Sequence, residues 1–295
     1  MVVWGFINRV ALELYKTHPD RLVVGGAYGA YRAPPNTIGP FGSNIAVRIS
    51  WPRAGLDVPE LWQEYWELVE SWQAKLAPGR LLRNSNNLST STQNGQTPVI
   101  FPVIFTRGIA RDLRALKGIS MGDRSSVPRS PDQYWQHPGI NHLNIYVLSR
   151  YLWNADQDLE ELLDEYYKLF YGPARKEMRA AFEFAEATYP REGPATPSRV
   201  PLSERIRLVE MLHRARAAAG DTVYGRRIRM IIDEFQPLDE LRALAAMAAK
   251  RGEVIEFPYL MPFDDDKWRE AAGTICMDGK LDEPFWTAYS GAVEL

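Results

Sequence analysis

Polar and aromatic side chains follow the ends of several buried apolar runs in this sequence, where a parallel sheet would bring them to one edge. The residues at these positions are Tyr28, Tyr31, Arg48, Trp51, Asn84, Ser85, Asp123 and Arg124. Aromatic rings can stack on sugar faces, and a guanidinium can hold a carboxylate or a pair of hydroxyl groups. These residue types are compatible with a carbohydrate-binding site, and the substrate-binding candidates are Tyr28, Tyr31, Arg48, Trp51 and Asn84.

Asp123 is the only carboxylate in this set. Glycosidases usually use two carboxyl groups, about 5–5.5 Å apart in retaining enzymes and about 6.5–9.5 Å apart in inverting enzymes. The sequence offers no such pair, so Asp123 is the single catalytic candidate, and we expect this chain alone to lack a complete catalytic pair. The alternative is that Asp123 caps its loop or pairs with Arg124.

Other roles remain open for three of the binding candidates. Tyr28 could pack inside the fold, and Trp51 could form a loop corner with Pro52. Arg48 alternates with Val47 and Ile49, so its charge needs a polar partner. A substrate carboxylate and a neighbouring aspartate serve that purpose equally well.

A metal or another cofactor is not expected. Asn154, Asp156 and Asp158 with Glu165 imitate the oxygen spacing of an EF-hand loop, but the position that requires glycine is Leu159. Helix capping by Asp156 or Asp158 explains these side chains better. The sequence also contains no Gly-x-Ser-x-Gly motif and no phosphate-binding loop.

The elements that would position the site alternate between strands and helices. We expect buried strands at 21–28, 45–50, 81–84 and 119–122, and helices over 4–18, 59–76 and 106–117. Alternation of this kind predicts parallel strands and an α/β architecture. The apolar stripe of the first helix is predicted from Phe6, Val10, Leu12 and Leu14.

After residue 140 the pattern becomes helical only. A whole (β/α)₈ barrel takes about 250 residues, and the alternating pattern covers far fewer. We therefore expect the C-terminal part of a TIM-like barrel followed by an all-helical domain, with Met1 as an internal start. The expected divisions are a partial barrel over 1–140, a helical domain over 141–252, a linker over 253–273 and a truncated β-sandwich module over 274–295.

The composition of the chain argues against nucleic acid and a membrane as partners. The chain has 295 residues, 45% hydrophobic and 24% charged, with a net charge of −2, so it offers nucleic acid little attraction. It has no apolar run long enough to span a membrane, and Asn8 and Arg9 interrupt the N-terminal stretch that a signal peptide would need. Its single cysteine, Cys276, excludes a disulfide within the chain.

Two stretches resemble a bacterial domain of unknown function found in glycoside hydrolases. The first is W-x-F-I-N-R-V-A from Trp4 to Ala11, with Pro19-Asp20 and the strand that leads to Tyr28-x-x-Tyr31-x-x-Pro34-Pro35. The second is L-W-N-x-D-x-D from Leu152 to Asp158, with Asp164-Glu165-Tyr166 and Tyr171-Gly172-Pro173-Ala174. Together they cover roughly residues 4–190. The family includes endo-β-N-acetylglucosaminidase-like enzymes, and its fold is similar to α-glucuronidase and β-hexosaminidase barrels.

A third stretch, from Met277 to Trp286, resembles the opening strand and turn of family-nine-type carbohydrate-binding modules. These resemblances imply a fragment of an extracellular or periplasmic glycoside hydrolase that acts on hexosamine- or uronate-containing glycans. In the family the acid/base motif lies upstream of the Trp4 segment. The rival hypothesis is a non-catalytic carbohydrate-binding or scaffold protein with a barrel-derived fold, and the sequence leaves the oligomeric state open.

Overall fold

The computed structural model describes residues 2–85, 99–125, 137–190 and 199–251. All of its helices and strands lie within residues 1–254, one compact unit of the chain. The fold is mixed α/β: a four-stranded parallel sheet with its connecting helices comes first, and a run of helices follows. The predicted linker and β-sandwich module lie outside the described residues.

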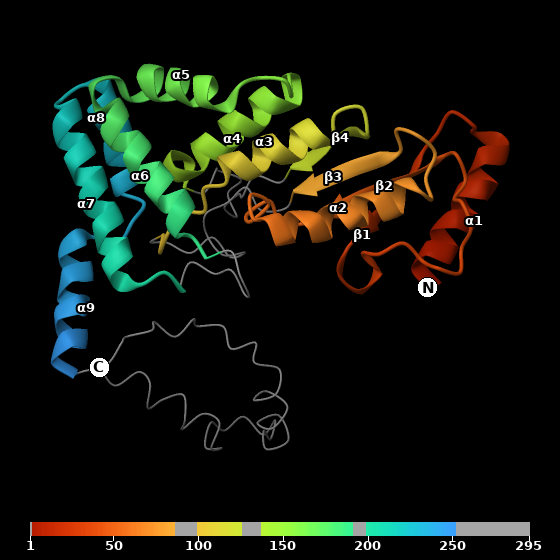
Figure 1. Cartoon of the computed structure of the whole chain (residues 1–295), viewed down its shortest axis with the longest axis horizontal. Helices are drawn as coiled ribbons and strands as arrows, with labels where there is room; N and C mark the ends of the chain where they lie inside the picture. The colour runs from red at the N-terminus through yellow and green to blue at the C-terminus, as the bar shows by residue number, and fades with distance from the viewer. Residues whose placement is uncertain (1, 86–98, 126–136, 191–198, 252–295) are drawn as a thin grey trace, which may run out of the picture. The chain divides into compact units, whose positions relative to one another are not determined.

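The sheet has the strand order β1-β2-β3-β4, which is the order of the chain (Figure 1). The strands are β1 (Val23–Ala27), β2 (Ile45–Ser50), β3 (Leu81–Ser85) and β4 (Ser120–Ser125). All neighbouring pairs are parallel. The four predicted strands are thus confirmed, with shifts of at most a few residues at their ends.

One helix precedes the sheet, and two helices connect β2 to β3 and β3 to β4. They are α1 (Val2–Thr17), α2 (Pro59–Gln73) and α3 (Thr106–Ala115), and a 3-10 turn, η1 (Gly29–Tyr31), follows β1. Pro59 starts α2 because a proline at the first helical position loses no internal hydrogen bond. Tyr65, Val69 and Trp72 recur every three or four residues along α2, and all three are buried.

Successive side chains of each strand point to opposite faces of the sheet. Two adjacent glycines in β1 identify these faces. A Cβ on Gly25 would lie 2.5 Å from the Trp4 ring of α1, whereas a Cβ on Gly26 would lie 3.6 Å from Nη2 of Arg48. One face therefore packs against helices, and we call it the helix face. The other carries Arg48, and we call it the Arg48 face.

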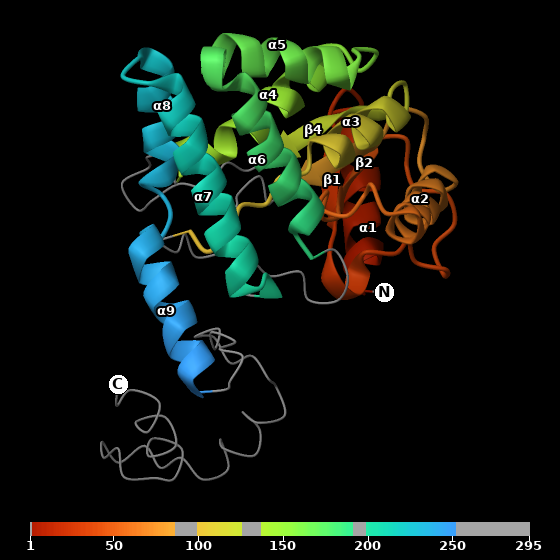
Figure 2. The ribbon, with the colours of Figure 1, turned by 60° about the vertical axis from the view of Figure 1, so that its left-hand side comes forward.

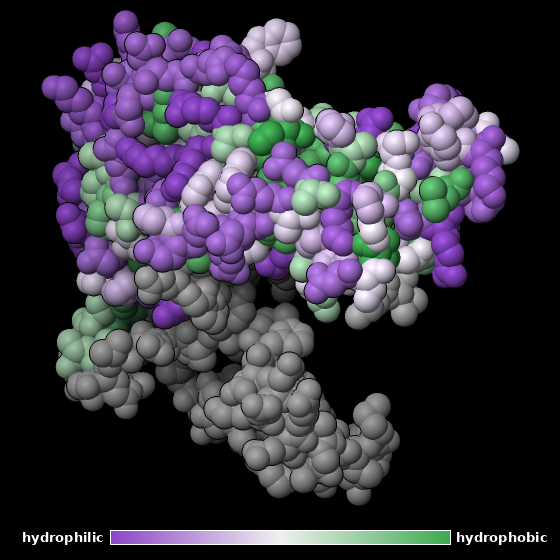
Figure 3. Space-filling view, turned by 45° about the vertical axis from the view of Figure 1, so that its right-hand side comes forward, coloured by the Kyte–Doolittle hydropathy of each residue, from purple (hydrophilic) through white to green (hydrophobic). Residues whose placement is uncertain are grey.

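The buried stripe of α1 differs from the prediction. Trp4 and Ala11 are buried, while Phe6 is 60% exposed and Val10 and Leu12 are also exposed. Trp4 is buried because its ring packs against the rings of Phe41 and Trp72, at centroid distances of 5.9 and 4.6 Å. Figure 3 shows green hydrophobic patches among the hydrophilic residues on one face of the molecule.

The second part of the chain is helical, as predicted. It contains α4 (Pro138–Trp153), α5 (Leu159–Tyr171), the 3-10 turn η2 (Gly172–Ala174), α6 (Arg175–Thr188), α7 (Leu202–Ala219), α8 (Val223–Ile232) and α9 (Leu238–Arg251). Helices α6 and α7 lie side by side in both ribbon views (Figures 1 and 2). Asp158 caps α5 by accepting a hydrogen bond of 2.9 Å from the Glu161 N–H, which confirms the capping interpretation.

Two hydrophobic clusters form the core. One joins α1 and α2 to the helix face of the sheet, and the other joins α3 to the helices from α4 onward. An isolated parallel bridge between Val99 and Phe235 connects distant parts of the second cluster. None of the described helices is both long and apolar enough to cross a lipid bilayer.

Candidate functional site

Four residues line up across the carboxyl ends of the strands on the Arg48 face. Asn84 pairs in register with Ser50 on one side and with Arg124 on the other. Tyr28 directly follows Ala27, which pairs with Ile49, and it keeps an extended backbone with φ −148° and ψ 148°. We call Tyr28, Ser50, Asn84 and Arg124 the strand-end row.

The two middle residues of the strand-end row are polar and buried, and the two outer residues are exposed. Asn84 Nδ2 donates a hydrogen bond of 2.6 Å to Ser50 Oγ, and both side chains are buried. The Tyr28 ring at one end is 56% exposed, and Arg124 at the other end is also exposed. A ligand could therefore contact a ring and a guanidinium above a fixed hydrogen-bonded pair.

Arg48 lies one step before the strand-end row. Its guanidinium lies beside β1, where a Cβ on Gly26 would be 3.6 Å from Nη2. Its Nε is buried and has no hydrogen-bond partner. The structure thus brings three of the predicted substrate-binding residues, Tyr28, Arg48 and Asn84, to one face of the sheet.

Tyr31 and Trp51 lie elsewhere. Tyr31 is in η1, where its carbonyl accepts a hydrogen bond of 3.0 Å from Trp4 Nε1 and its side chain is 40% exposed. The Trp51 ring lies 5.8 Å from that of Tyr65 and 4.9 Å below the Arg32 guanidinium. Trp51 therefore packs on the helix face, away from Arg48, because it falls an odd number of residues after it.

Asp123 also belongs to the helix face. It pairs in register with Arg83, and its carboxylate forms an ion pair with Nη2 of Arg53. Both of these ion-paired side chains are buried. The structure thus gives Asp123 a partner, Arg53, that the sequence analysis did not name. A catalytic role for Asp123 remains a prediction, and it would require this ion pair to open.

Asp112 of α3 is the centre of the same buried group. Its Oδ2 accepts from Nε of Arg53 at 2.7 Å and from Nε of Arg83 at 2.9 Å, while its Oδ1 accepts from the Tyr65 hydroxyl at 2.7 Å. We call Arg53, Arg83, Asp112 and Asp123 the arginine–aspartate cluster. Because two cations face two anions, the cluster is neutral overall and joins the sheet to α3.

The charges of the cluster control its protonation. Burial alone would raise the pKa of Asp112, but the charges of Arg83 and Arg53 and the hydrogen bonds outweigh it, so the pKa is lowered. Burial and the Asp112 charge together raise the pKa of Tyr65 well above its usual range. Asp112 therefore stays ionised and Tyr65 stays neutral near pH 7, as a structural ion-pair network requires.

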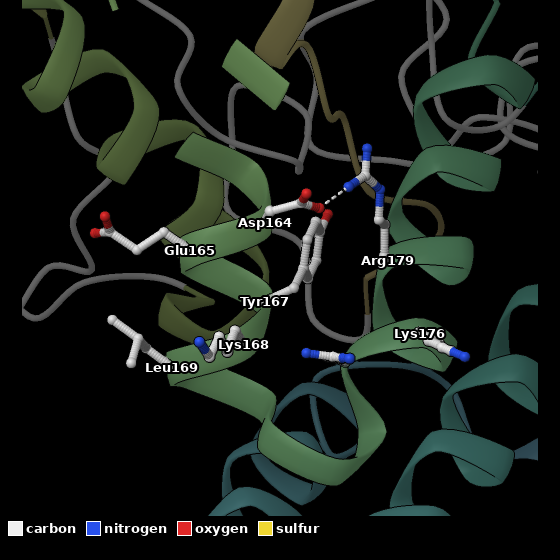
Figure 4. Close-up of a pocket in the computed structure, with 8 residues that line it drawn as sticks. Asp164, Glu165, Tyr167, Lys168, Leu169, Lys176 and Arg179 are labelled. Carbon is white, nitrogen blue, oxygen red and sulfur yellow. Dashed lines mark hydrogen bonds and ion pairs between the residues drawn. The ribbon is translucent and has the colours of Figure 1, made fainter. Parts of the chain in front are cut away.

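Figure 4 shows a separate hollow of about 600 Å³ between α5 and α6. Its lining is Asp164, Glu165, Tyr167, Lys168, Leu169, Arg175, Lys176 and Arg179. Arg179 pairs there with Asp164, and also with Glu160 and Glu183. Four basic and two acidic side chains line this hollow, and Arg179 and Asp164 are engaged with each other in an ion pair. The hollow lies between two helices and not at the carboxyl ends of the strands, so the strand-end row is the stronger candidate site.

Sequence reasoning missed Ser50 and the arginine–aspartate cluster. Ser50 could have been found by counting in twos from Arg48, since alternate residues of a strand share a face. The same counting separates Trp51 from Arg48. Arg53 and Asp112 lie in a loop and on a helix, 59 positions apart, and no spacing rule predicts such a contact.

The fold and the strand-end row define a mixed α/β protein with a candidate ligand site at the carboxyl ends of parallel strands. Within the described part of the chain, no group of three or more potential metal ligands occurs. The chain belongs to the family of the Domain of unknown function (DUF4838), whose model matches residues 1–183. No curated protein and no solved structure matched it.

Proposed function

We propose that this chain is the glycan-binding part of an extracellular or periplasmic glycoside hydrolase that acts on hexosamine- or uronate-containing glycans. In this proposal the sheet is the C-terminal part of a (β/α)₈ barrel. Four parallel strands in chain order, with a helix between β2 and β3 and another between β3 and β4, support that assignment. The resemblance to carbohydrate-binding modules after residue 276 supports a glycan as the ligand.

The strand-end row is the observation that carries the proposal. Ligands of parallel α/β folds bind at the carboxyl ends of the strands, where this row lies. It combines an exposed ring at Tyr28, a hydrogen-bonded pair at Ser50 and Asn84, and an exposed cation at Arg124. A pyranose presents an apolar face and a rim of hydroxyl groups, and this row complements both.

Binding without hydrolysis is the activity that we assign to residues 1–295 alone. Glycosidases usually need two carboxyl groups beside the scissile bond. The strand residues of the Arg48 face include no carboxylate within the described ranges, and Asp123 is paired with Arg53 on the opposite face. We expect the purified chain to turn over no aryl-glycoside. Turnover that a substitution within the chain abolishes would contradict this assignment.

A matched pair of tyrosines tests the binding site. In glycan-array and titration measurements, Tyr28→Ala should weaken glycan binding by about 1–3 kcal/mol, the cost of removing a stacking ring. Tyr15→Ala is the control, because Tyr15 is 45% exposed but lies on α1. Equal effects of the two substitutions would remove the strand-end row from the proposal. Binding by the full-length protein without any hydrolysis would favour the scaffold hypothesis.

A further inference from the structure

We propose that the site selects glycans that carry a carboxylate, and that Arg48 is the residue that recognises it. This inference rests on the proposed function and decides between its two substrate classes, in favour of uronates over hexosamines. The observation behind it is a buried donor atom without a hydrogen-bond partner. Arg48 Nε is buried and has no hydrogen-bond partner.

An unpartnered buried donor on a charged side chain is costly, because the protein has removed its water without replacing the hydrogen bond. Folded proteins rarely leave such atoms unpaired, and an exception calls for an explanation, such as a catalytic role or a bound ion. Arg48 forms no ion pair with any residue of the described ranges. Its charge is therefore available to a ligand.

The nearby acids are held on the other face of the sheet. Asp112 bridges Arg53 and Arg83, and Asp123 pairs with Arg53. The sequence alone allowed a neighbouring aspartate as the partner of Arg48, and the arginine–aspartate cluster accounts for both aspartates near the strand ends. Among the described residues no acid is left to pair with Arg48, so we assign that role to a carboxylate of the ligand.

The described strand residues of the Arg48 face are positive in sum. Its described strand residues include the cations Arg48 and Arg124 and no carboxylate. A face of one sign favours a ligand of the opposite sign over a neutral N-acetylhexosamine of the same size. The planar fork of a guanidinium matches a carboxylate with two parallel hydrogen bonds, which gives geometric preference as well as attraction.

The Arg48 guanidinium is also close to the strand-end row. The Arg48 guanidinium lies beside Gly26, two residues before Tyr28 on the same face of β1. A pyranose that stacks on Tyr28 could thus extend its C5 carboxylate toward Arg48, while its hydroxyl groups face Ser50 and Asn84. A Cβ on Gly26 would lie 3.6 Å from Nη2 of Arg48, an ordinary contact distance, so the guanidinium lies close against β1.

Isothermal titration of the full chain, residues 1–295, tests the inference. The probes are an oligosaccharide of glucuronic acid, its carboxyl-reduced glucose counterpart, an N-acetylglucosamine oligosaccharide of equal length and a sulfated neutral oligosaccharide. We expect the uronate to bind about tenfold or more tightly than the other three. This comparison uses the wild-type protein and does not depend on the folding of a variant.

Two arginine variants then test whether Arg48 causes the preference for the uronate. Arg48→Gln should lower affinity for the uronate by about tenfold to a hundredfold and leave affinity for the carboxyl-reduced sugar unchanged. Arg9→Gln, an exposed position on α1, is the matched control and should change neither. Thermal unfolding of each variant verifies that it is folded.

The titrations distinguish a failure of this inference from a failure of the proposed function. Equal affinity for the uronate and its carboxyl-reduced counterpart would overturn the inference and leave the proposed glycan binding intact. Tightest binding of the sulfated sugar would also overturn it, since the recognised group would then be a sulfate. Absence of binding to all four probes would overturn the proposed function, and the inference with it.

Discussion

Asp112 and Arg83 form a buried ion pair, 2.9 Å between Oδ2 and Nε, that ties α3 to the middle of the sheet. Both side chains are inaccessible to solvent. Arg83 also donates to the backbone carbonyls of Asn84 at 2.9 Å and of Trp51 at 2.7 Å. The pair therefore fixes the ends of two neighbouring strands as well as the helix above them.

Removal of the Asp112 charge should be severely destabilising. Asp112→Asn leaves Arg83 without a buried counter-ion, and breaking a buried pair by neutralising one partner costs about 3–5 kcal/mol. Glu64→Gln, at an exposed position of α2, is the control and should change stability by less than about 0.5 kcal/mol. Chemical denaturation measures both. A loss below about 1 kcal/mol in Asp112→Asn would show that the cluster does not hold the sheet to α3.

Trp51 should support stability more than binding. Its half-buried ring contacts Tyr65 and Arg32 on the helix face, so Trp51→Ala should lower the free energy of unfolding by roughly 1–2 kcal/mol. Glycan affinity should stay within about twofold of wild type, since less than about 0.4 kcal/mol separates such affinities. Titration and thermal unfolding of the same sample measure both quantities. A large loss of affinity at constant stability would restore Trp51 to the binding site.

Stability should depend on pH through Glu234. Burial raises its pKa to about 7, although hydrogen bonds from the Gly139 and Ile140 N–H groups oppose the rise. The folded state then binds more protons than the unfolded state between the ordinary carboxyl pKa and about 7. The free energy of unfolding should therefore fall as pH rises through this window. Glu234→Gln should flatten the profile, whereas Asp239→Asn, at an exposed position, should leave it unchanged. A wild-type profile that rises with pH here would contradict the prediction.

Self-association should involve α1. Val3, Phe6 and Val10 are exposed, and their spacing places them on one face of the helix. An exposed apolar face beside the edge strand β1 favours association of chains. Light scattering over a range of concentrations should show oligomers that Phe6→Glu with Val10→Glu disperses. Leu12→Glu, on a different side of α1, is the control. A wild-type chain that stays monomeric at high concentration would refute this prediction.

The sequence alone determined the elements of the fold. Buried apolar runs such as Ile45–Ser50 predicted the strands, because a strand covered on its inner side must be apolar there. Pro59 and the three- and four-residue spacing after it predicted α2. The W-x-F and L-W-N stretches indicated the family that the comparison then identified over residues 1–183. These features are local, so the order of residues suffices to show them.

Only the tertiary structure decided which polar residues meet. It separated Trp51 from Arg48, paired Asn84 with Ser50, and assigned Asp123 to Arg53. It also buried Trp4 rather than Phe6, because two further aromatic rings from distant positions complete the packing around Trp4. The physical reason is common to all of these cases. Faces and partners depend on strand register and on helix packing, and these join residues that lie far apart in the chain.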